Sequence, residues 1–412
     1  MVIDNNIRSA AQKLNLLDET KINAVLGSLA EAMAANASFI LDANAKDLAL
    51  MDKQNPLYDR LALTPERLAA IADDIRNVAE LPSPLHKILA ETVRPNGMRL
   101  RKVSVPFGVV GVIYEARPNV TFDVFALCFK TANACVLKGS SNAHHSNTAI
   151  VSVIEQTLAA HKVDTNSIVL LPAEREFTDV LLAARGKVDV IIPRGNAGLI
   201  DYVREHSKVP VIETGTGVCH IYADEFADIA LAKNIVANAK TRRVSVCNAA
   251  ECLIVHQRCA DQLPEICSGL AAKNVQLFAD AKAYTALQEH YPQELLFKAQ
   301  EEHFGCEFLD YKMAVKVVAD ILEAIDFISA HGTMHSECIV SNNEKNIALF
   351  QQSVDAACVY ANVSTAFSDG AQFGLGTEIG ISTQKLHVRG PTGLAELCSY
   401  KWLINGNGQV RS

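Results

Sequence analysis

The sequence predicts an α/β fold built around two successive units of parallel β-sheet, and three observations support this. First, 412 residues, of which 49% are hydrophobic and 20% charged, suffice for two or three domains with buried cores. Second, from about residue 99 the chain carries short runs rich in β-branched residues that are apolar throughout. Third, helical stretches separate these runs. Strands without polar alternation are typical of parallel sheets that helices cover on both faces.

The first 90 or so residues are predicted to be helical. Five apolar residues in this region recur at helical spacing, namely Ile22, Val25, Leu26, Leu29 and Met33. A further helix is expected to start at Thr64 and Pro65, because threonine is a good N-cap and proline suits the first helical position. Two prolines, at 82 and 84, end the helical pattern.

The first unit of alternating strands and helices follows. Predicted strands cover 109–114, 134–138, 168–172, 188–193 and 209–213. Predicted helices cover 122–133, 146–161, 176–185 and 197–206. Because such sheets bind ligands at the carboxyl ends of their strands, we expect a binding site at that edge.

A second α/β unit is predicted after residue 228. It starts with a helix at 228–240, a strand at 251–256, a helix at 260–271 and a strand at 275–278. Strands at 313–318, 338–341 and 357–362 then alternate with helices at 321–330 and 344–353. Residues 363–412 are rich in Gly, Thr and Ser and end in a strand-like run at 400–404.

Charge and composition argue against several classes of function. The net charge of −8 argues against nucleic-acid binding, because phosphate neutralisation requires a basic surface. The longest apolar runs have the length of strands, so no membrane-spanning segment is expected. The N-terminus lacks a basic start followed by an apolar core, and we therefore expect a cytoplasmic protein.

The eleven cysteines contain no Cys-x-x-Cys pair, and most are expected to be small buried side chains. The densest stretch of cysteines contains Cys247, Cys252, Cys259 and Cys267. These four are spaced more widely than the ligand pairs of structural zinc sites, so no metal is predicted.

Cys247 stands out from the other cysteines. It lies in a predicted turn between a helix and a strand, with Arg242 and Arg243 upstream. Nearby positive charge lowers the pKa of a thiol and makes the thiolate available. We interpret Cys247 as a nucleophile, and a buried structural thiol is the alternative.

Three polar segments allow more than one interpretation. The turn at 193–198 is either structural or a place where a helix N-terminus offers N–H groups to a pyrophosphate. His331 and His335 are four residues apart, but Gly332 disfavours a helix, so we expect a loop in which His335 and Glu337 form hydrogen bonds. Residues 374–391 are rich in Gly and anion-binding side chains and are either a substrate loop or a subunit contact.

Six blocks of sequence carry a family resemblance. They are Val105-Pro-Phe-Gly-Val-Val-Gly-Val-Ile-Tyr-Glu-Ala-Arg-Pro-Asn119-Val-Thr, Val136-Leu-Lys138-Gly-Ser-Ser, Ile212-Glu213-Thr-Gly-Thr-Gly, Cys247-Asn-Ala, His335-Ser-Glu, and Gly380-Ile-Ser-Thr-Gln-Lys with Arg389-Gly-Pro. In this order they resemble the γ-glutamyl phosphate reductases, the proline-biosynthesis branch of the aldehyde dehydrogenase superfamily. Val218 and Val244 depart from the family pattern, which usually has Asn and Pro there.

The resemblance implies NADPH-dependent reduction of L-glutamyl 5-phosphate to L-glutamate 5-semialdehyde with release of phosphate. It implies an aldehyde-dehydrogenase-like fold with an NADPH-binding domain at 1–98 and 106–240 and a catalytic domain at 241–370. A hairpin at 99–105 and a C-terminal arm at 371–412 would form the oligomerisation element, with 371–391 also reaching the catalytic site. A homo-oligomer (dimer or tetramer) is expected, and a transient contact with glutamate 5-kinase stays open.

The same resemblance implies roles for single residues. Cys247 is expected to form a thioester, with Asn119 and the Cys247 backbone N–H as donors to the oxyanion. Glu213 matches the residue that activates water in oxidising aldehyde dehydrogenases, but a reductase must not hydrolyse its thioester, so that role is not assigned. Residues expected to bind the cofactor are Lys138, Ser140, Gly195, Gly198, Glu213 and Glu307. Unranked candidates for binding the substrate are Arg117, Arg243, His335, Lys385 and Arg389.

Three other functions compete with this interpretation. An ordinary NAD(P)-dependent aldehyde dehydrogenase would form acids without phosphate. A cysteine acyltransferase or hydrolase without a cofactor would gain no protection of Cys247 from NADPH. A catalytically inactive partner that scaffolds a glutamate kinase would be unaffected by Cys247→Ser.

Overall fold

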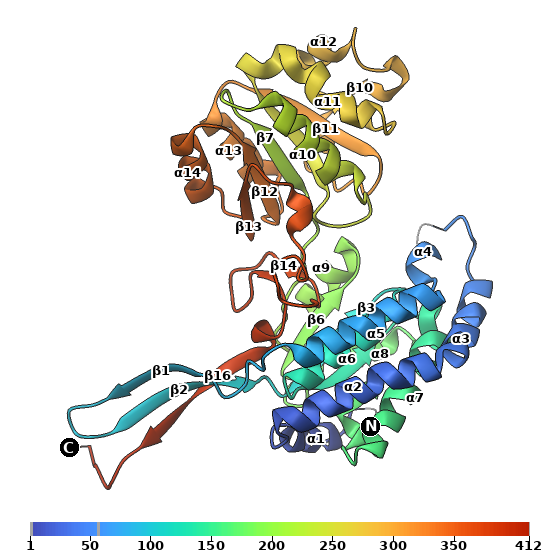
Figure 1. Ribbon diagram of the computed structural model, residues 1–412, viewed down its shortest axis with the longest axis vertical. Helices are drawn as coiled ribbons and strands as arrows, with labels where there is room; N and C mark the ends of the chain where they lie inside the picture. Colours follow the sequence, from blue (N-terminus) through green and yellow to red (C-terminus); the bar gives the residue numbers. More distant parts are fainter. Residues whose placement is uncertain (1–2, 56–57, 412) are drawn as a thin grey trace. The chain divides into compact units, whose positions relative to one another are not determined.

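The computed structural model describes residues 3–55 and 58–411 and divides into two compact units (Figure 1). The first unit comprises Met1–Thr214, Gly374–Gly380 and Thr392–Ser412. The second comprises Gly215–Phe373 and Ile381–Pro391. The chain passes from one packing unit to the other after Thr214. The boundary expected between the cofactor-binding and catalytic domains, after residue 240, stays a prediction.

The first unit begins with the predicted helices, which are α1 (Asn6–Leu14), α2 (Glu19–Ala35), α3 (Ala37–Ala49), α4 (Tyr58–Leu61) and α5 (Pro65–Glu80). The five apolar residues predicted to form one face of α2 are all buried. Thr64 caps α5, since its side chain accepts a hydrogen bond from the N–H of Arg67 at 3.2 Å, and this confirms the predicted helix start.

A four-stranded sheet in the order β5-β4-β3-β6 forms the core of the first unit. All its strand pairs are parallel, as predicted. The strands are β3 (Val109–Tyr114), β4 (Ala134–Lys138), β5 (Ile168–Leu170) and β6 (Val190–Arg194), and the helices between and after them are α6 (Asn119–Lys130), α7 (His144–Ala160), α8 (Glu176–Leu182) and α9 (Ala197–His206).

The predicted strand at 209–213 is wrong. In that segment Val211 forms only an isolated bridge with Ile191. Two backbone hydrogen bonds, from Ile191 N–H to the Pro210 carbonyl and from Ile212 N–H to the Ile191 carbonyl, form this single pairing. Pro210 has no N–H to continue the ladder, so the segment pairs with β6 at this one point and forms no strand.

A three-stranded antiparallel sheet projects from the helical part of the first unit as a long arm (Figure 1). Its order is β1-β2-β16, and its strands are β1 (Ile88–Val93), β2 (Arg99–Pro106) and β16 (Cys398–Asn405). The hairpin and C-terminal strand are thus paired as predicted, although the sequence interpretation missed β1. All six residues of β1 are exposed, so the strand belongs to no buried core, although four of the six, Ile88, Leu89, Ala90 and Val93, are apolar.

The second unit is a seven-stranded parallel sheet in the order β10-β9-β11-β8-β7-β12-β13. Its strands are β7 (Cys219–Ala223), β8 (Ala250–His256), β9 (Gln276–Ala279), β10 (Leu296–Lys298), β11 (Lys312–Val318), β12 (Ser336–Val340) and β13 (Cys358–Ala361). Its helices are α10 (Ile229–Thr241), α11 (Leu263–Ala271), α12 (Ala281–Leu287), α13 (Ile321–His331) and α14 (Glu344–Ser353), and a small ribbon pairs β14 (Ile381–Ser382) with β15 (Gly390–Pro391).

Alternate residues of these strands pack into two hydrophobic clusters. Leu253 and Val255 of β8 join residues of α10, α11 and α12 in one cluster. Cys252 and Ile254 of the same strand join residues of α13 and α14 in the other. Helices therefore cover both faces of the sheet, which confirms the predicted doubly wound α/β class.

Among the described residues, no single helix is long and apolar enough to cross a membrane. The bent pair α2 and α3 meets the length and composition requirement only when the two helices are taken together.

Candidate active site

Cys247 lies where the sequence predicts it, in the loop that joins α10 to β8. The side chain of Asp228 caps the start of α10 by accepting a hydrogen bond from the N–H of Leu231. The helix ends at Thr241 and β8 begins at Ala250, so the loop is short. Cys247 and Cys306 are half-buried, and the other nine of the eleven cysteines, all within the described residues, are buried. The nucleophile candidate is thus one of two thiols with access to solvent.

The backbone of Cys247 packs against the segment that leads into β7. A methyl group on Gly217 would lie 1.5 Å from the carbonyl oxygen of Cys247, so only glycine fits there. The thiol of Cys219 donates a hydrogen bond to the same oxygen at 3.2 Å. The Gly-rich block at 212–217 therefore serves the cysteine loop through close backbone contact.

Asn248 ties the loop to the segment that follows β13. Its Nδ2 donates to the carbonyl oxygen of Ser368 at 2.9 Å. Its own carbonyl oxygen accepts a hydrogen bond from the Thr365 hydroxyl at 2.8 Å. The residue that directly follows Cys247 is thereby anchored by two hydrogen bonds.

A buried chain of polar groups extends from the cysteine loop. His335 Nδ1 lies 3.7 Å from the Cys219 sulfur and 2.8 Å from the Ser336 hydroxyl. The chain continues through the hydroxyls of Ser368 and Tyr360, which are 2.8 Å apart. Burial lowers the pKa of His335 to about 4, so the ring is neutral near pH 7.

His335 is fully buried, and this leaves no surface for the predicted contact with substrate. His335 instead contacts the Cys219 thiol, which donates a hydrogen bond to the Cys247 carbonyl oxygen. Glu337 also forms the expected hydrogen bonds, since its carboxylate accepts from the N–H of His220 at 2.8 Å and lies 2.9 Å from the Nδ1 of that ring.

A buried ion pair joins the two ends of the cysteine loop. Lys240 in the last turn of α10 and Glu251 in β8 are 2.5 Å apart between Nζ and Oε2, and both side chains are essentially inaccessible. Burial raises the pKa of Glu251 to about 7, although Lys240 opposes the shift. Burial also lowers the pKa of Lys240. The sequence interpretation missed this pair, whose signal is a charged residue within the apolar run of β8.

These residues lie at the amino ends of their strands. Gly217, Cys247 and His335 lie one to three residues before β7, β8 and β12, which are neighbours in the order β8-β7-β12. The expectation of a site at the carboxyl ends of strands does not describe this sheet. In the first unit, Lys138 ends β4 and Glu115 follows β3, so both lie at the carboxyl edge where the site is expected.

A cavity of about 400 Å³ opens at that carboxyl edge of the first sheet, within the size range of ligand sites. Lys138 lines it, and its Nζ donates to the carbonyl oxygens of Gly139 and Ala173 at 2.9 and 3.0 Å. The Ser140 hydroxyl is buried there without a hydrogen-bond partner among the described residues. A cation and an unsatisfied hydroxyl suit the ribose and phosphate oxygens of a dinucleotide.

The predicted pyrophosphate turn joins β6 to α9. Asn196 caps the helix by accepting from the N–H of Leu199 at 2.9 Å, and its Nδ2 donates to Glu115 Oε1 at 2.6 Å. A methyl group on Gly195 would lie 2.6 Å from Leu199. Glu115 and Leu199 line the cavity described above, whereas Gly195 and Gly198 do not.

Asn119 begins α6 in the first unit. Its Nδ2 donates to Asp123 Oδ2 at 3.1 Å, which fixes the amide and leaves a second N–H on the same nitrogen. Arg117 lies half-buried two residues earlier. Glu213, also in the first unit, is 3.7 Å from Arg204 Nη1.

The remaining predicted residues lie in the second unit. Glu307 Oε1 accepts from the N–H of Gly217 at 2.7 Å, close to the cysteine loop. Lys385 and Arg389 both pair with Asp355, at 2.5 and 2.7 Å, so each already has an acidic partner. Arg243 is exposed in the cysteine loop. Among the described residues no three His, Cys, Asp or Glu side chains gather as metal ligands.

Comparison with known proteins gives consistent results. Residues 4–280 match the aldehyde dehydrogenase family. A γ-glutamyl phosphate reductase of Bacteroides thetaiotaomicron is 58% identical over 98% of this chain and 97% of its own. The crystal structure of a γ-glutamyl phosphate reductase from Thermotoga maritima superimposes with a TM-score of 0.94 at 38% identity, over 98% of each chain. An acetylating aldehyde dehydrogenase from Geobacillus thermoglucosidasius shares the fold, with a TM-score of 0.70 at 16% identity over 98% of this chain and 96% of its own.

Proposed function

Because the chain belongs to the γ-glutamyl phosphate reductase branch of the aldehyde dehydrogenase family, we propose that it reduces L-glutamyl 5-phosphate to L-glutamate 5-semialdehyde with NADPH, in proline biosynthesis. The observation that carries the proposal is the half-buried Cys247, whose carbonyl oxygen packs against Gly217 and whose neighbour Asn248 is anchored on both sides. A nucleophile held this firmly needs little reorganisation before it attacks.

Cys247 acts first as a nucleophile. Its thiolate attacks the C5 carbonyl carbon of the acyl phosphate to form a C–S bond. The tetrahedral intermediate then collapses, the C–O bond to phosphate breaks, and a thioester remains on the sulfur. In the second step the thioester carbonyl is reduced, the C–S bond breaks, and the aldehyde leaves with regeneration of the thiolate.

Oxygen carries negative charge in both tetrahedral species. We assign the Asn119 side chain and the backbone N–H of Cys247 as its donors. Removing one such donor costs about 3–4 kcal/mol of transition-state stabilisation in comparable sites. The hydrogen bond from Asn119 to Asp123 supports the assignment, because it holds the amide in one orientation.

NADPH would supply the hydride that reduces the thioester. Lys138, Ser140, Gly195 and Gly198 are the residues assigned to its ribose, phosphate and pyrophosphate oxygens. Glu307 is assigned to the nicotinamide ribose, and its hydrogen bond with the Gly217 N–H holds it beside the cysteine loop. Lys138 and Ser140 favour NADPH over NADH, because the 2′-phosphate adds an anion that a cation and an unsatisfied hydroxyl would bind.

Glu213 is assigned to the cofactor side of the site rather than to the activation of water. Its carboxylate lies 3.7 Å from Arg204 Nη1. A reductase needs no residue that activates water, because its thioester must survive until hydride transfer.

We also propose a homo-oligomer formed through the three-stranded arm. The arm exposes large apolar side chains, and patches of this kind mark interaction surfaces. They are Ile88, Leu89, Val93, Tyr400, Trp402 and Ile404. The cytoplasmic location and the contact with glutamate 5-kinase stay predictions.

Phosphate dependence tests the proposed function. Run in reverse, the enzyme should oxidise the semialdehyde with NADP only when phosphate or arsenate is present, and Cys247→Ala should abolish turnover while NADPH still binds. Formation of free glutamate without phosphate would point to an ordinary aldehyde dehydrogenase. Full activity of Cys247→Ala would refute the nucleophile.

A further inference from the structure

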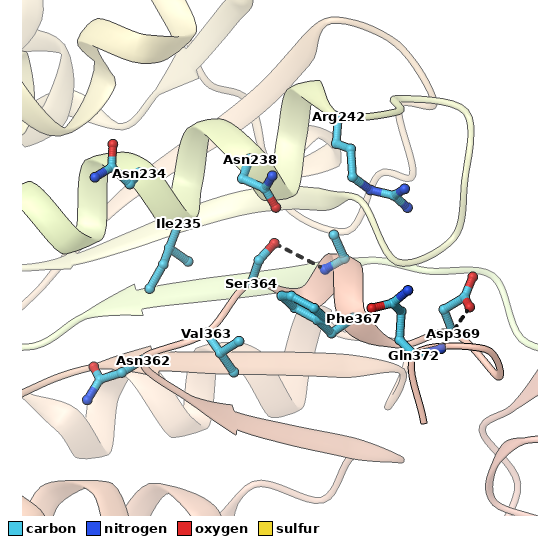
Figure 2. A pocket seen from close by; sticks show the side chains of 11 residues that line it. Asn234, Ile235, Asn238, Arg242, Asn362, Val363, Ser364, Phe367, Asp369 and Gln372 are labelled. Atoms are coloured by element: carbon cyan, nitrogen blue, oxygen red, sulfur yellow. Dashed lines mark hydrogen bonds between the residues drawn. The ribbon is translucent and has the colours of Figure 1, made fainter. Parts of the chain in front are cut away.

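A second cavity, of about 470 Å³, lies entirely within the second unit (Figure 2). Its volume falls in the range of small-ligand sites. Seven of its eleven lining residues are polar or charged, and none of the eleven was assigned to a ligand above. They are Asn234, Ile235, Asn238, Arg242, Asn362, Val363, Ser364, Ala366, Phe367, Asp369 and Gln372.

One wall is a face of α10 and its end. Asn234, Asn238 and Arg242 are spaced four residues apart, which places their side chains on one side of the helix. In Figure 2 all three lie along the helix that borders the pocket, with Asn234 at one end and Arg242 at the other. Two amides and a guanidinium supply donors along this whole wall.

The opposite wall is the segment after β13, which contains Ser364, Phe367 and Asp369. The carboxylate of Asp369 is fixed by the backbone, because its Oδ1 accepts from the N–H groups of Ala371 and Gln372 at 3.0 and 3.3 Å. Figure 2 shows Asp369 at the same end of the pocket as Arg242. Neither of the two forms an ion pair with another residue in the described part of the chain.

The cavity is physically joined to the nucleophile. Arg242 stands at the start of the loop that carries Cys247, five residues before it. The residue after the nucleophile, Asn248, bonds to Thr365 and Ser368, which belong to the segment that forms the opposite wall. A molecule bound between the two walls therefore contacts the same hydrogen-bonded assembly that positions Cys247.

We propose that this cavity binds the α-amino acid end of the substrate, with Arg242 paired to the α-carboxylate and Asp369 to the α-ammonium group. The proposal rests on the proposed function, which makes the substrate a glutamyl compound. A fixed carboxylate beside a guanidinium matches a zwitterion. Inorganic phosphate fits less well because Asp369 would repel it, and a simple carboxylate would leave Asp369 without a cationic partner. Asn238, one turn before Arg242 on α10, supplies a neutral donor and acceptor to the same cavity.

Such a site determines specificity. Polar groups that lose their partner make a site reject analogues that lack the matching substrate group. Arg242 and Asp369 are therefore specificity-determining residues that act on the end of the substrate remote from the reacting carbon.

The test combines two variants with three aldehydes, assayed in the phosphate-dependent oxidation with NADP. L-Glutamate 5-semialdehyde carries both charged groups, 5-oxopentanoate lacks the ammonium group, and butanal lacks both. Arg242→Gln should lower kcat/KM about 10- to 100-fold for the first two and leave butanal unchanged, because a charge-assisted hydrogen bond is lost. Asp369→Asn should lower kcat/KM by a similar factor for the semialdehyde alone.

Arg258→Gln is the matched control, since Arg258 pairs with Glu225 on the surface of the same unit and should change none of the three values. Competitive inhibition by L-norvaline, which has the amino acid end but no aldehyde, should weaken in both variants and gives a readout independent of turnover.

Other outcomes would overturn the proposal. An equal loss with all three aldehydes would make the role structural, and an increase only in the KM for phosphate would assign Arg242 to the phosphate. Unchanged kinetics would mean that substrate does not enter this cavity. Failure of the wild-type enzyme to oxidise the semialdehyde with phosphate would instead refute the proposed function, and the two failures are thus distinguishable.

Discussion

The buried pair of Lys240 and Glu251 gives a prediction with a defined magnitude. Lys240→Met removes the cation and leaves Glu251 in a site where its side chain is about 1% accessible. The other hydrogen bond to this carboxylate, from the Leu309 N–H, is long at 3.4 Å. Breaking a buried pair in this way costs about 3–5 kcal/mol. For a unit of 150–250 residues this corresponds to a loss of about 6–20 °C in Tm.

The loss should depend on pH, and its sign follows from the pKa of Glu251. Burial raises that pKa from 4.5 to about 7 in the folded wild type, and without Lys240 it should rise further. A raised folded-state pKa means that stability is retained below about pH 4.5 and decreases as the pH rises through the folded value. The difference in Tm between Lys240→Met and wild type should therefore be larger at pH 8 than at pH 5.5.

Thermal unfolding followed by circular dichroism at both pH values measures this effect. The double variant Lys240→Met/Glu251→Leu should recover most of the stability, because a well-packed apolar pair replaces a buried ion pair at little cost. Lys312→Met is the control, since it breaks an exposed pair with Asp310 and should cost less than about 1 kcal/mol. A loss below about 1 kcal/mol in Lys240→Met at pH 8 would show that the pair does not hold the ends of the loop.

Three further predictions concern single positions. Gly217→Ala should leave the enzyme folded but lower kcat by about 100-fold or more, because the new methyl group displaces the Cys247 carbonyl. The control is Gly27→Ala, where a methyl group meets nothing within 4 Å. Equal activity of the two variants would contradict the contact between Gly217 and Cys247. Lys138→Ala should raise the KM for NADPH about 10-fold or more with little change in kcat, and an unchanged preference over NADH would count against a 2′-phosphate contact. Trp402→Lys should dissociate the oligomer on size-exclusion chromatography, because Trp402 is 49% exposed on the arm; an intact oligomer would place the interface elsewhere.

The sequence predicts the strands and helices that local pattern determines. The apolar run of β8 and the helical spacing in α2 are visible without a structure, and both elements are found where they are expected. β7 was missed because it follows a Gly-rich block and contains His220, a polar residue that is buried only through its pairing with Glu337. That pairing joins residues 117 positions apart, so no local pattern reveals it.

The candidate site shows the same limit more sharply. Position and flanking charge single out Cys247, but what holds it in place comes from distant parts of the chain. Gly217 lies in a Gly-rich block whose sequence does not reveal this contact, yet its lack of a side chain is what lets the segment before β7 approach the Cys247 carbonyl. The candidate cations for substrate binding cannot be ranked from the sequence, because the acidic residues that pair with each of them are known only from the fold. Lys385 and Arg389 share Asp355, whereas Arg242 faces a cavity, and only the folded chain separates the two cases.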